Sequence, residues 1–387
     1  MVTVENRSRR QIGESKRLII KIGSALLVDE KTGKIRNNWL TGLAKEIANL
    51  KSQGTSVVVV SSGAIAVGRS HLELSSGILA LEQKQASAAT GQIRLAHAWQ
   101  EALAHHNITV AQILLTPSDT EERRRHLNAR ATIETLLNLG AIPVINENDT
   151  VATEEIRYGD NDRLAARVAQ MISADTLILL SDVDGLYDGD PQKHSEAKLI
   201  LEVHNITPQI EAMAGNSSST YSSGGMVTKL EAAKIAMAAG CSMAIVDGKA
   251  ADIIERLKAG SSCTWFIPKS EPLTARKGWI AGSVTSSGSI TIDRGALDAL
   301  KLGKSLLPAG VEDVEGSFER GDVVSIRVID GEIIGLGLSA YSSEDALLIC
   351  GRKSRDIEGI LGYRGRDEMV HRDDLVIKTN ESEKSEQ

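Results

Sequence analysis

The chain has 387 residues, enough for two or three domains of roughly 150 residues each. Its 44 basic and 51 acidic side chains give a formal net charge of −7, which argues against a general affinity for nucleic acid or anionic lipid. No apolar run approaches the ~18 residues that a membrane span needs. We therefore expect a globular protein that makes no contact with a membrane.

The two ends of the chain and its cysteines indicate where the protein resides. Residues 1–16 are polar and lack the apolar core of a secretory signal, so we expect a disordered arm and a cytoplasmic location. The charged residues 378–387 are expected to form a disordered tail. Cys241, Cys263 and Cys350 show neither metal-ligand nor disulfide spacing, which indicates buried thiols in a reducing compartment.

Residues 17–268 alternate between short β-branched runs and long Ala- and Leu-rich amphipathic segments. A helix is expected at about residues 38–52, and further helices between the later strands. The strand runs are apolar throughout, which is typical of a parallel sheet covered on both faces. We therefore predict an α/β domain with an open, mostly parallel sheet, whose strands lie at about residues 17–22, 56–62, 107–115, 141–148, 175–182 and 241–248.

The pattern changes at residues 269–275, which we interpret as a linker. Beyond them, short strands are interrupted by Gly, Ser and Asp, as in small β-rich domains. We predict such a domain over residues 276–377, with strands within residues 289–296, 321–341 and 345–352.

Polar residues follow several of the predicted strands, and ligands of open parallel sheets bind beyond the carboxyl ends of the strands. Lys21 ends the first strand, and Ser62 and Gly63 follow the second and lead into a helix. A helix N-terminus suits a phosphate or a carboxylate. The alternatives are a surface lysine and simple helix capping by a serine.

The densest polar cluster follows the strand at residues 141–148. It combines residues 146–149 with residues 159–162, and both groups are rich in Asn and Asp. Carboxylates can hold an ammonium group while amides bind a carboxylate, which is what an amino acid ligand requires. A divalent metal site is the alternative, because hard cations take the same oxygen ligands.

Two further polar segments are expected at the same end of the predicted sheet, beyond the carboxyl ends of its strands. Ser181 and Asp182 end the strand at residues 175–182, and a Ser/Gly loop precedes a helix whose first turns contain Lys229. Glycines in such a loop allow close approach to a phosphate, and the lysine adds positive charge. Two lysines near a carboxylate-rich turn suggest phosphoryl transfer from a nucleotide to a carboxylate.

Six motifs occur in a fixed order along the first predicted domain: IIKIGSALL, VVSSGAIAVGR, PVINENDTVAT, YGDND, LLSDVDGLYDGDP and GGMVTK. Together they closely resemble the glutamate-phosphorylating members of the amino acid kinase family. The second domain looks like the PUA domain attached to many bacterial members, with SLLPAGV and ILGY in the expected places. The resemblance covers about residues 17–377.

The resemblance implies the amino acid kinase fold and ATP-dependent phosphorylation of the side-chain carboxylate of L-glutamate. The products would be γ-glutamyl phosphate and ADP, in the first step of proline biosynthesis. ATP and Mg²⁺ are implied, with the metal held by the ATP phosphates rather than by a dedicated protein site. Feedback inhibition by proline and a homo-oligomer, a dimer or a tetramer, are also expected from the family.

The resemblance also implies roles for individual residues. Lys21 and Lys229 would contact the phosphates and stabilise charge during transfer, and Asp162 would orient these two lysines. Glutamate would be bound by Ser62, Asp149 and Asn161. The residues implied in ATP binding are Lys21, Ser181, Asp182, Ser223, Gly224, Gly225, Met226, Val227, Thr228 and Lys229.

Two other functions stay open at this point. Acetylglutamate, aspartate, carbamate and UMP kinases share the lysines and glycines, although NENDTVAT followed by YGDND favours the glutamate enzymes. PUA domains elsewhere bind RNA, which would suit an RNA-binding regulator. Residues 276–372 hold thirteen Lys and Arg against fifteen Asp and Glu, which argues against RNA binding. A local basic patch keeps that alternative open: Arg352, Lys353, Arg355, Arg364 and Arg366.

Overall fold

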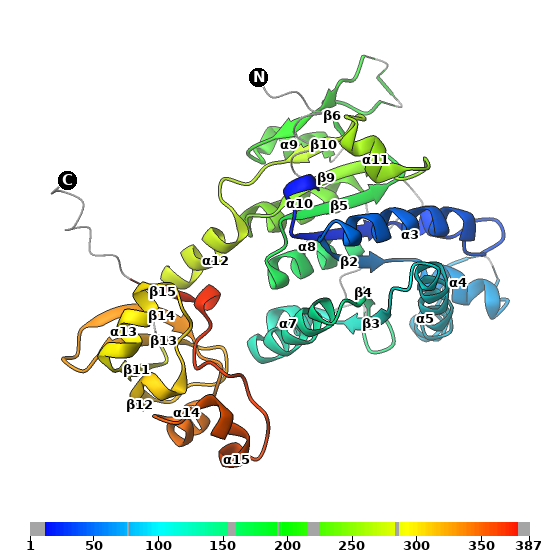
Figure 1. Cartoon of the computed structure of the whole chain (residues 1–387). Helices are drawn as coiled ribbons and strands as arrows, with labels where there is room; N and C mark the ends of the chain where they lie inside the picture. The colour runs from blue at the N-terminus through cyan, green and yellow to red at the C-terminus, as the bar shows by residue number, and fades with distance from the viewer. Residues whose placement is uncertain are drawn as a thin grey trace. The chain divides into compact units, whose positions relative to one another are not determined.

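The structure is a computed structural model that describes residues 12–75, 77–153, 160–191, 193–194, 196–214, 225–282 and 286–377. The chain forms two compact units that divide between Pro272 and Leu273 (Figure 1). The first unit is an α/β domain, and the second is built on a five-stranded sheet. The predicted fold class is confirmed.

An eight-stranded sheet forms the centre of the first unit, in the order β3-β4-β2-β1-β5-β9-β10-β8. The first six strands in this order are parallel, and β10 then pairs antiparallel with β9. The sheet is open and mostly parallel, as predicted. Its strands are β1 (Arg17–Ile22), β2 (Ser56–Ser61), β3 (Val110–Leu115), β4 (Ile142–Glu147), β5 (Thr176–Ser181), β8 (Glu202–Val203), β9 (Ser242–Asp247) and β10 (Thr264–Phe266). A separate pair comprises β6 (Leu186–Tyr187) and β7 (Leu199–Ile200).

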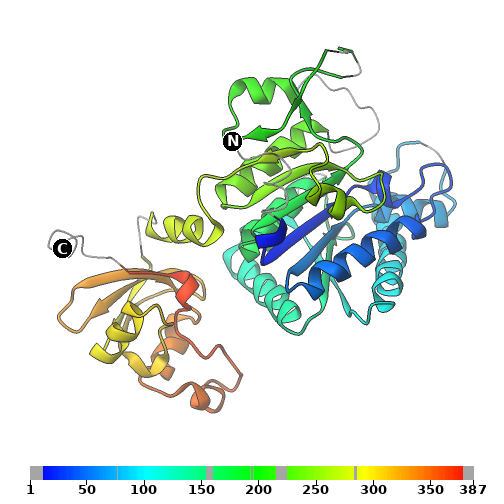
Figure 2. The same cartoon turned by 45° about the horizontal axis from the view of Figure 1, so that its top comes forward.

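Helices cover both faces of this sheet (Figure 2). One face packs against α2 (Ser24–Leu27), α3 (Asn37–Ser52), α4 (Ala64–His71), α5 (Leu81–Ala104) and α11 (Ile253–Lys258). The other packs against α7 (Arg123–Asn138), α8 (Asn161–Ile172), α9 (Pro208–Ala214) and α10 (Met226–Ala238). A short helix, α6 (Pro117–Glu121), follows β3. Each face has its own buried apolar cluster, so the strands are apolar on both sides.

Alternation along β1 decides which helices each side chain meets. Leu18, Ile20 and Ile22 belong to the cluster with α3 and α5, whereas Ile19 belongs to the cluster with α8 and α10. Successive side chains of a strand point to opposite faces. Lys21 therefore faces α8 and α10.

Helices α4 and α5 contact each other through glycines. A Cβ atom at Gly68 would lie 1.7 Å from the carbonyl oxygen of Ser87, and one at Gly91 would lie 1.8 Å from that of Ala64. Only a residue without a side chain permits such backbone contact. The first turn of α4, which directly follows the end of β2, is thus held against α5.

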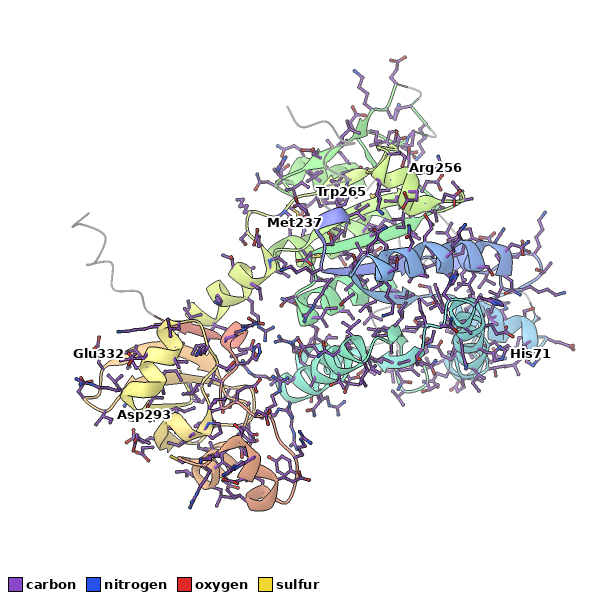
Figure 3. All side chains as sticks on the ribbon, viewed as in Figure 1. His71, Met237, Arg256, Trp265, Asp293 and Glu332 are labelled. Carbon is purple, nitrogen blue, oxygen red and sulfur yellow. The ribbon has the colours of Figure 1, made fainter. Side chains whose placement is uncertain are left out.

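The second unit contains a sheet in the order β12-β11-β13-β14-β15 with its own apolar core. Asp293, labelled in Figure 3, begins α13 by accepting a hydrogen bond from the Ala296 N–H at 2.6 Å. The strands are β11 (Gly288–Ile292), β12 (Val311–Gly316), β13 (Val323–Val328), β14 (Ile333–Leu338) and β15 (Leu375–Ile377). The helices are α12 (Pro272–Ala281), α13 (Arg294–Lys301), α14 (Ser343–Ile349) and α15 (Ile357–Leu361).

The prediction of a strand within residues 345–352 is wrong, because α14 occupies most of that segment. Ser342 accepts a hydrogen bond from the Asp345 N–H at 3.2 Å, and Glu344 and Asp345 lie in the first turn. A serine cap followed by acidic residues is a helix start signal. This local signal determines the structure, although the apolar run that follows also suits a strand.

The structure of residues 12–16 also differs from the prediction. Residues 12–14 are helical, Ile12 is buried in the core, and Ser15 Oγ lies 2.7 Å from Thr176 Oγ1. Residues 12–16 are therefore ordered rather than part of a disordered arm. Residues 1–11 and 378–387 lie outside the described residues. The predicted linker, residues 269–275, includes the start of α12.

Candidate active site

Five neighbouring strands bring polar residues to one edge of the sheet. Because β4, β2, β1, β5 and β9 are parallel, their carboxyl ends lie at the same edge. Asn146, Ser61, Lys21, Ser181 and Asp247 are at or next to these ends. This edge is where open α/β sheets bind ligands.

The centre of this edge is a buried cluster of two lysines on one carboxylate. Lys21 Nζ lies 2.5 Å from Asp162 Oδ1, and Lys229 Nζ lies 3.1 Å from Asp162 Oδ2. The relative exposures of Lys21, Lys229 and Asp162 are 8%, 7% and 0%. Thr228 Oγ1 donates to Asp162 Oδ2 at 3.3 Å. Two ammonium groups share one carboxylate, so the cluster has a net positive charge.

Local structure holds Asp162 in place. It lies in the first turn of α8, and Asp160 caps that helix by accepting from the N–H groups of Asp162 and Arg163 at 3.0 and 3.1 Å. An aspartate cap is favoured because it satisfies N–H groups that lack helical partners. The cap fixes the helix start from which Asp162 reaches both lysines.

The two aspartates have opposite pKa shifts. Burial alone would raise the pKa of Asp162, but the charges of Lys21 and Lys229 outweigh it and lower that pKa. At Asp160 burial dominates and raises the pKa, although hydrogen bonds from Arg163 act against it. Asp162 is therefore an anion at neutral pH and stabilises both ammonium groups.

Asn161 connects the cluster to the end of β2. Its Nδ2 lies 2.8 Å from Ser61 O, 2.9 Å from Ser62 Oγ and 2.8 Å from Asn146 Oδ1. An amide nitrogen has only two hydrogens, so two of these three acceptors are satisfied at once. Because Ser62 Oγ is the acceptor in its contact with Asn161, the hydroxyl can direct its own hydrogen toward a ligand.

The turn after Ser62 is held from both sides. Gly63 has a φ of 102°, a conformation that favours glycine, and it directly precedes α4. On the other side, Trp99 Nε1 of α5 donates to Ser61 Oγ at 3.3 Å. A single tryptophan in an amphipathic helix indicates only a core position, so no sequence signal assigns Trp99 to this edge.

Asp149 lies in the turn after β4. Asn148 N donates to Leu115 O at 2.8 Å, which ties this turn to β3, and Gln85 Nε2 of α5 donates to Ala152 O at 3.1 Å. The backbone on both sides of Asp149 is thereby fixed. Residues 154–159, which include the predicted Gly159, lie outside the described residues.

Besides Lys21, the described residues predicted to bind a nucleotide lie at the end of β5 and at the start of α10. Ser181 Oγ donates to Asp182 Oδ1 at 3.1 Å. Gly225 precedes α10, and Met226, Val227, Thr228 and Lys229 form its first turn. Ser223 and Gly224 lie outside the described residues. The structure thus places Lys21, Asp162, Thr228 and Lys229 in one cluster, Asn161 and Ser62 beside it, and Ser181 and Asp182 at the next strand.

Within the described part of the chain, no group of three His, Cys, Asp or Glu side chains is arranged to hold a metal ion. None of the helices described there is long and apolar enough to cross a membrane. Cys241 and Cys263 are buried and Cys350 is partly buried, and all three are free thiols.

An open α/β sheet with two buried lysines on one aspartate, beside a helix N-terminus, is the kind of site that suits a phosphotransferase. The sequence profile of the amino acid kinase family matches residues 16–247, and that of the PUA domain matches residues 288–361. The chain belongs to the amino acid kinase family. The resemblance predicted from the six motifs is confirmed.

Relatives match over nearly the whole chain. The glutamate 5-kinase of Paramagnetospirillum magneticum is 62% identical over 367 residues, which are 95% of this chain and 99% of that protein. The glutamate 5-kinase of Rhodospirillum rubrum is 57% identical, covering 93% and 96% of the two chains. That of Rhizobium rhizogenes is 56% identical, covering 98% and 97%.

Proposed function

We propose that the protein transfers the γ-phosphoryl group of ATP to the side-chain carboxylate of L-glutamate. The products are ADP and γ-glutamyl phosphate, and the reaction is the first step of proline biosynthesis. The observation that carries this proposal is the cluster of Lys21 and Lys229 on Asp162, beside Asn161 and Ser62. The glutamate 5-kinases that match nearly the whole chain support glutamate as the acceptor.

The acceptor needs no general base, because a glutamate side chain is already ionised at neutral pH. One carboxylate oxygen forms a bond to the γ-phosphorus while the bond from that phosphorus to the ADP oxygen breaks. Lys21 and Lys229 stabilise the charge on the transferred group, as in phosphoryl transfer generally. Asp162 holds both ammonium groups in position before the reaction, which avoids reorganisation during it.

Three residues are proposed to bind glutamate. Asp149 pairs with its ammonium group, and Ser62 donates a hydrogen bond to one of its carboxylate oxygens. The Nδ2 hydrogens of Asn161 are already used within the protein, so this residue accepts a hydrogen bond from the ammonium group through its Oδ1. Asn161 is already within hydrogen-bond distance of Ser62 Oγ. These two side chains can therefore contact the same ligand, next to the two lysines.

ATP is proposed to lie along the ends of β1, β5 and β9. Ser181 and Asp182 contact it from β5, and Ser223, Gly224, Gly225, Met226, Val227 and Thr228 approach it together with Lys229. The first N–H groups of α10 lack partners within the helix, and its N-terminus provides positive potential for phosphates. Mg²⁺ bound to the phosphates would offset further negative charge.

Steady-state ADP release by the purified protein tests this function. MgATP is supplied with L-glutamate, acetylglutamate, aspartate, carbamate or UMP in parallel. Of these acceptors, we expect only L-glutamate to give turnover. Equal or faster turnover with another acceptor would reject glutamate as the substrate.

Inhibition by proline is proposed to occur at the glutamate site, because proline carries the same ammonium and carboxylate groups. Competition against L-glutamate in the same assay is the expected result.

A cytoplasmic location and a homo-oligomer, a dimer or a tetramer, also stay proposals. Light scattering of the purified protein measures its oligomeric state.

A further inference from the structure

The loop between β9 and α11, residues 248–252, is fixed against the end of β5. Gly248 N donates to Ser181 O at 2.9 Å, and Trp39 Nε1 of α3 donates to Gly248 O at 2.7 Å. A Cβ atom at Gly248 would lie 2.4 Å from Leu26 Cδ1, so the backbone fits closely. The loop therefore has a defined position beside the residues proposed to bind ATP.

Lys249 extends from this loop across the end of β5. Its Nζ donates to Asp182 O at 2.7 Å, and its backbone N–H donates to Asp247 Oδ1 at 3.0 Å. The side chain is exposed. In the described part of the chain its ammonium group has no carboxylate within ion-pair distance, whereas Lys21 and Lys229 share Asp162. Among the residues that the structure describes, Asp182 O is the acceptor of one of its three N–H donors, and the other two can reach a ligand.

The helix after this loop cannot bind a phosphate at its N-terminus. The buried Glu46 of α3 accepts hydrogen bonds from the N–H groups of Ile253, Ile254 and Glu255 at 3.1, 2.7 and 3.3 Å. An internal carboxylate thus occupies the place that a ligand anion takes at other helix starts. Arg256, labelled in Figure 3, lies further along this helix, α11. Of the described residues in this loop and the first turn of α11, Lys249 is the one that offers a positive charge at this strand end.

From these contacts we infer that Lys249 is a nucleotide-binding residue that contacts a phosphate near the nucleoside end of ATP. The inference rests on the proposed function for the identity of the nucleotide. The strand order β4-β2-β1-β5-β9 places the proposed glutamate site at β4 and β2, and Lys21 at β1. A nucleotide whose γ-phosphate meets Lys21 extends toward β5 and β9. Lys249 therefore meets the α- or β-phosphate.

Binding measurements without any acceptor test this inference independently of glutamate. Isothermal titration calorimetry of the full chain gives the Kd values of MgADP, AMP and adenosine. In Lys249→Met we expect the Kd of MgADP to rise about tenfold and that of adenosine to stay within twofold, because only a charge-assisted hydrogen bond is lost. Lys249→Arg keeps the charge and should restore most of the affinity. An increase in the AMP Kd as well would assign the contact to the α-phosphate.

Lys258→Met is the matched control, because Lys258 lies at the far end of α11, the helix that follows the Lys249 loop, and pairs with Glu255 at 3.1 Å. It should leave all three Kd values unchanged. Unchanged MgADP affinity in Lys249→Met would overturn the inference. Equal weakening of MgADP and adenosine would overturn it too, since that result indicates a distorted loop rather than a lost phosphate contact. Loss of MgADP affinity in a protein that does not phosphorylate glutamate would support the inference while rejecting the proposed acceptor.

Discussion

Lys229 and Lys21 contact different oxygens of one carboxylate, although they come from α10 and β1. Asp162 is fully buried and holds both ammonium groups close together. Two ammonium groups that contact the same side chain repel each other, and an anion between them offsets this repulsion. The aspartate therefore allows a positively charged centre to exist before any nucleotide binds.

Replacing either lysine should affect the chemical step. We expect Lys21→Ala and Lys229→Ala each to lower kcat about 100-fold or more, since electrostatic groups of this kind contribute on the order of 3 kcal/mol to the transition state. Steady-state ADP release with saturating L-glutamate and MgATP measures the effect. Lys234→Ala removes an exposed lysine from the same helix and should keep the wild-type rate. Near-normal turnover in either active-site variant would remove that lysine from the mechanism.

Asp162 should make stability depend on acidic pH. Its folded pKa lies below the ordinary value of 3.8, so its contribution is fully present above about pH 4 and is lost as the pH falls through the folded pKa. Asp162→Asn leaves two buried ammonium groups without their partner, and we expect a loss of about 3 to 5 kcal/mol at pH 7.

Urea unfolding at pH 7 and pH 3, followed by tryptophan fluorescence, measures this effect. The difference in unfolding free energy between wild type and Asp162→Asn should shrink at pH 3. Asp313→Asn, on an exposed strand position of the second unit, serves as the control and should change little. A difference that does not depend on pH would contradict a lowered pKa at Asp162.

Much of this site follows from local sequence patterns. Apolar runs identify the parallel strands, and the alternation along β1 places Lys21 on the same face as α8 and α10. Strand ends then predict which polar residues share an edge. The pairing of both lysines with Asp162 followed from the family resemblance, because spacing alone does not determine which carboxylate they meet.

Contacts between distant segments could not be predicted. Glu46 caps a helix whose first N–H is 207 residues away, and Trp99 of α5 donates to Ser61, 38 residues before it in the chain. In sequence, both residues look like ordinary positions of amphipathic helices. Their partners depend on tertiary packing, and no local pattern encodes that packing.

Asp149 should affect glutamate binding more than catalysis. An ion pair with the ammonium group of glutamate is present in both ground and transition states, so its loss raises KM more than it lowers kcat. We expect Asp149→Ala to raise the glutamate KM at least about tenfold, with kcat within a few-fold of wild type. Initial rates over a range of L-glutamate concentrations give both constants. A large fall in kcat with an unchanged KM would instead place Asp149 near the phosphates.

The contact between α4 and α5 should control the position of the Ser62 turn. Gly91→Ala places a Cβ atom 1.8 Å from Ala64 O, so the helices must separate, and we expect a loss of about 1 to 3 kcal/mol in unfolding free energy. Because Ala64 begins the helix after Ser62 and Gly63, the glutamate KM should rise as well. Gly42→Ala is the matched control, since Gly42 lies within α3 with no atom in reach of a new Cβ. That substitution should stabilise the protein by about 0.5 to 1 kcal/mol and leave KM unchanged. Equal effects of the two substitutions would show that helix propensity, rather than backbone contact, determines the role of Gly91.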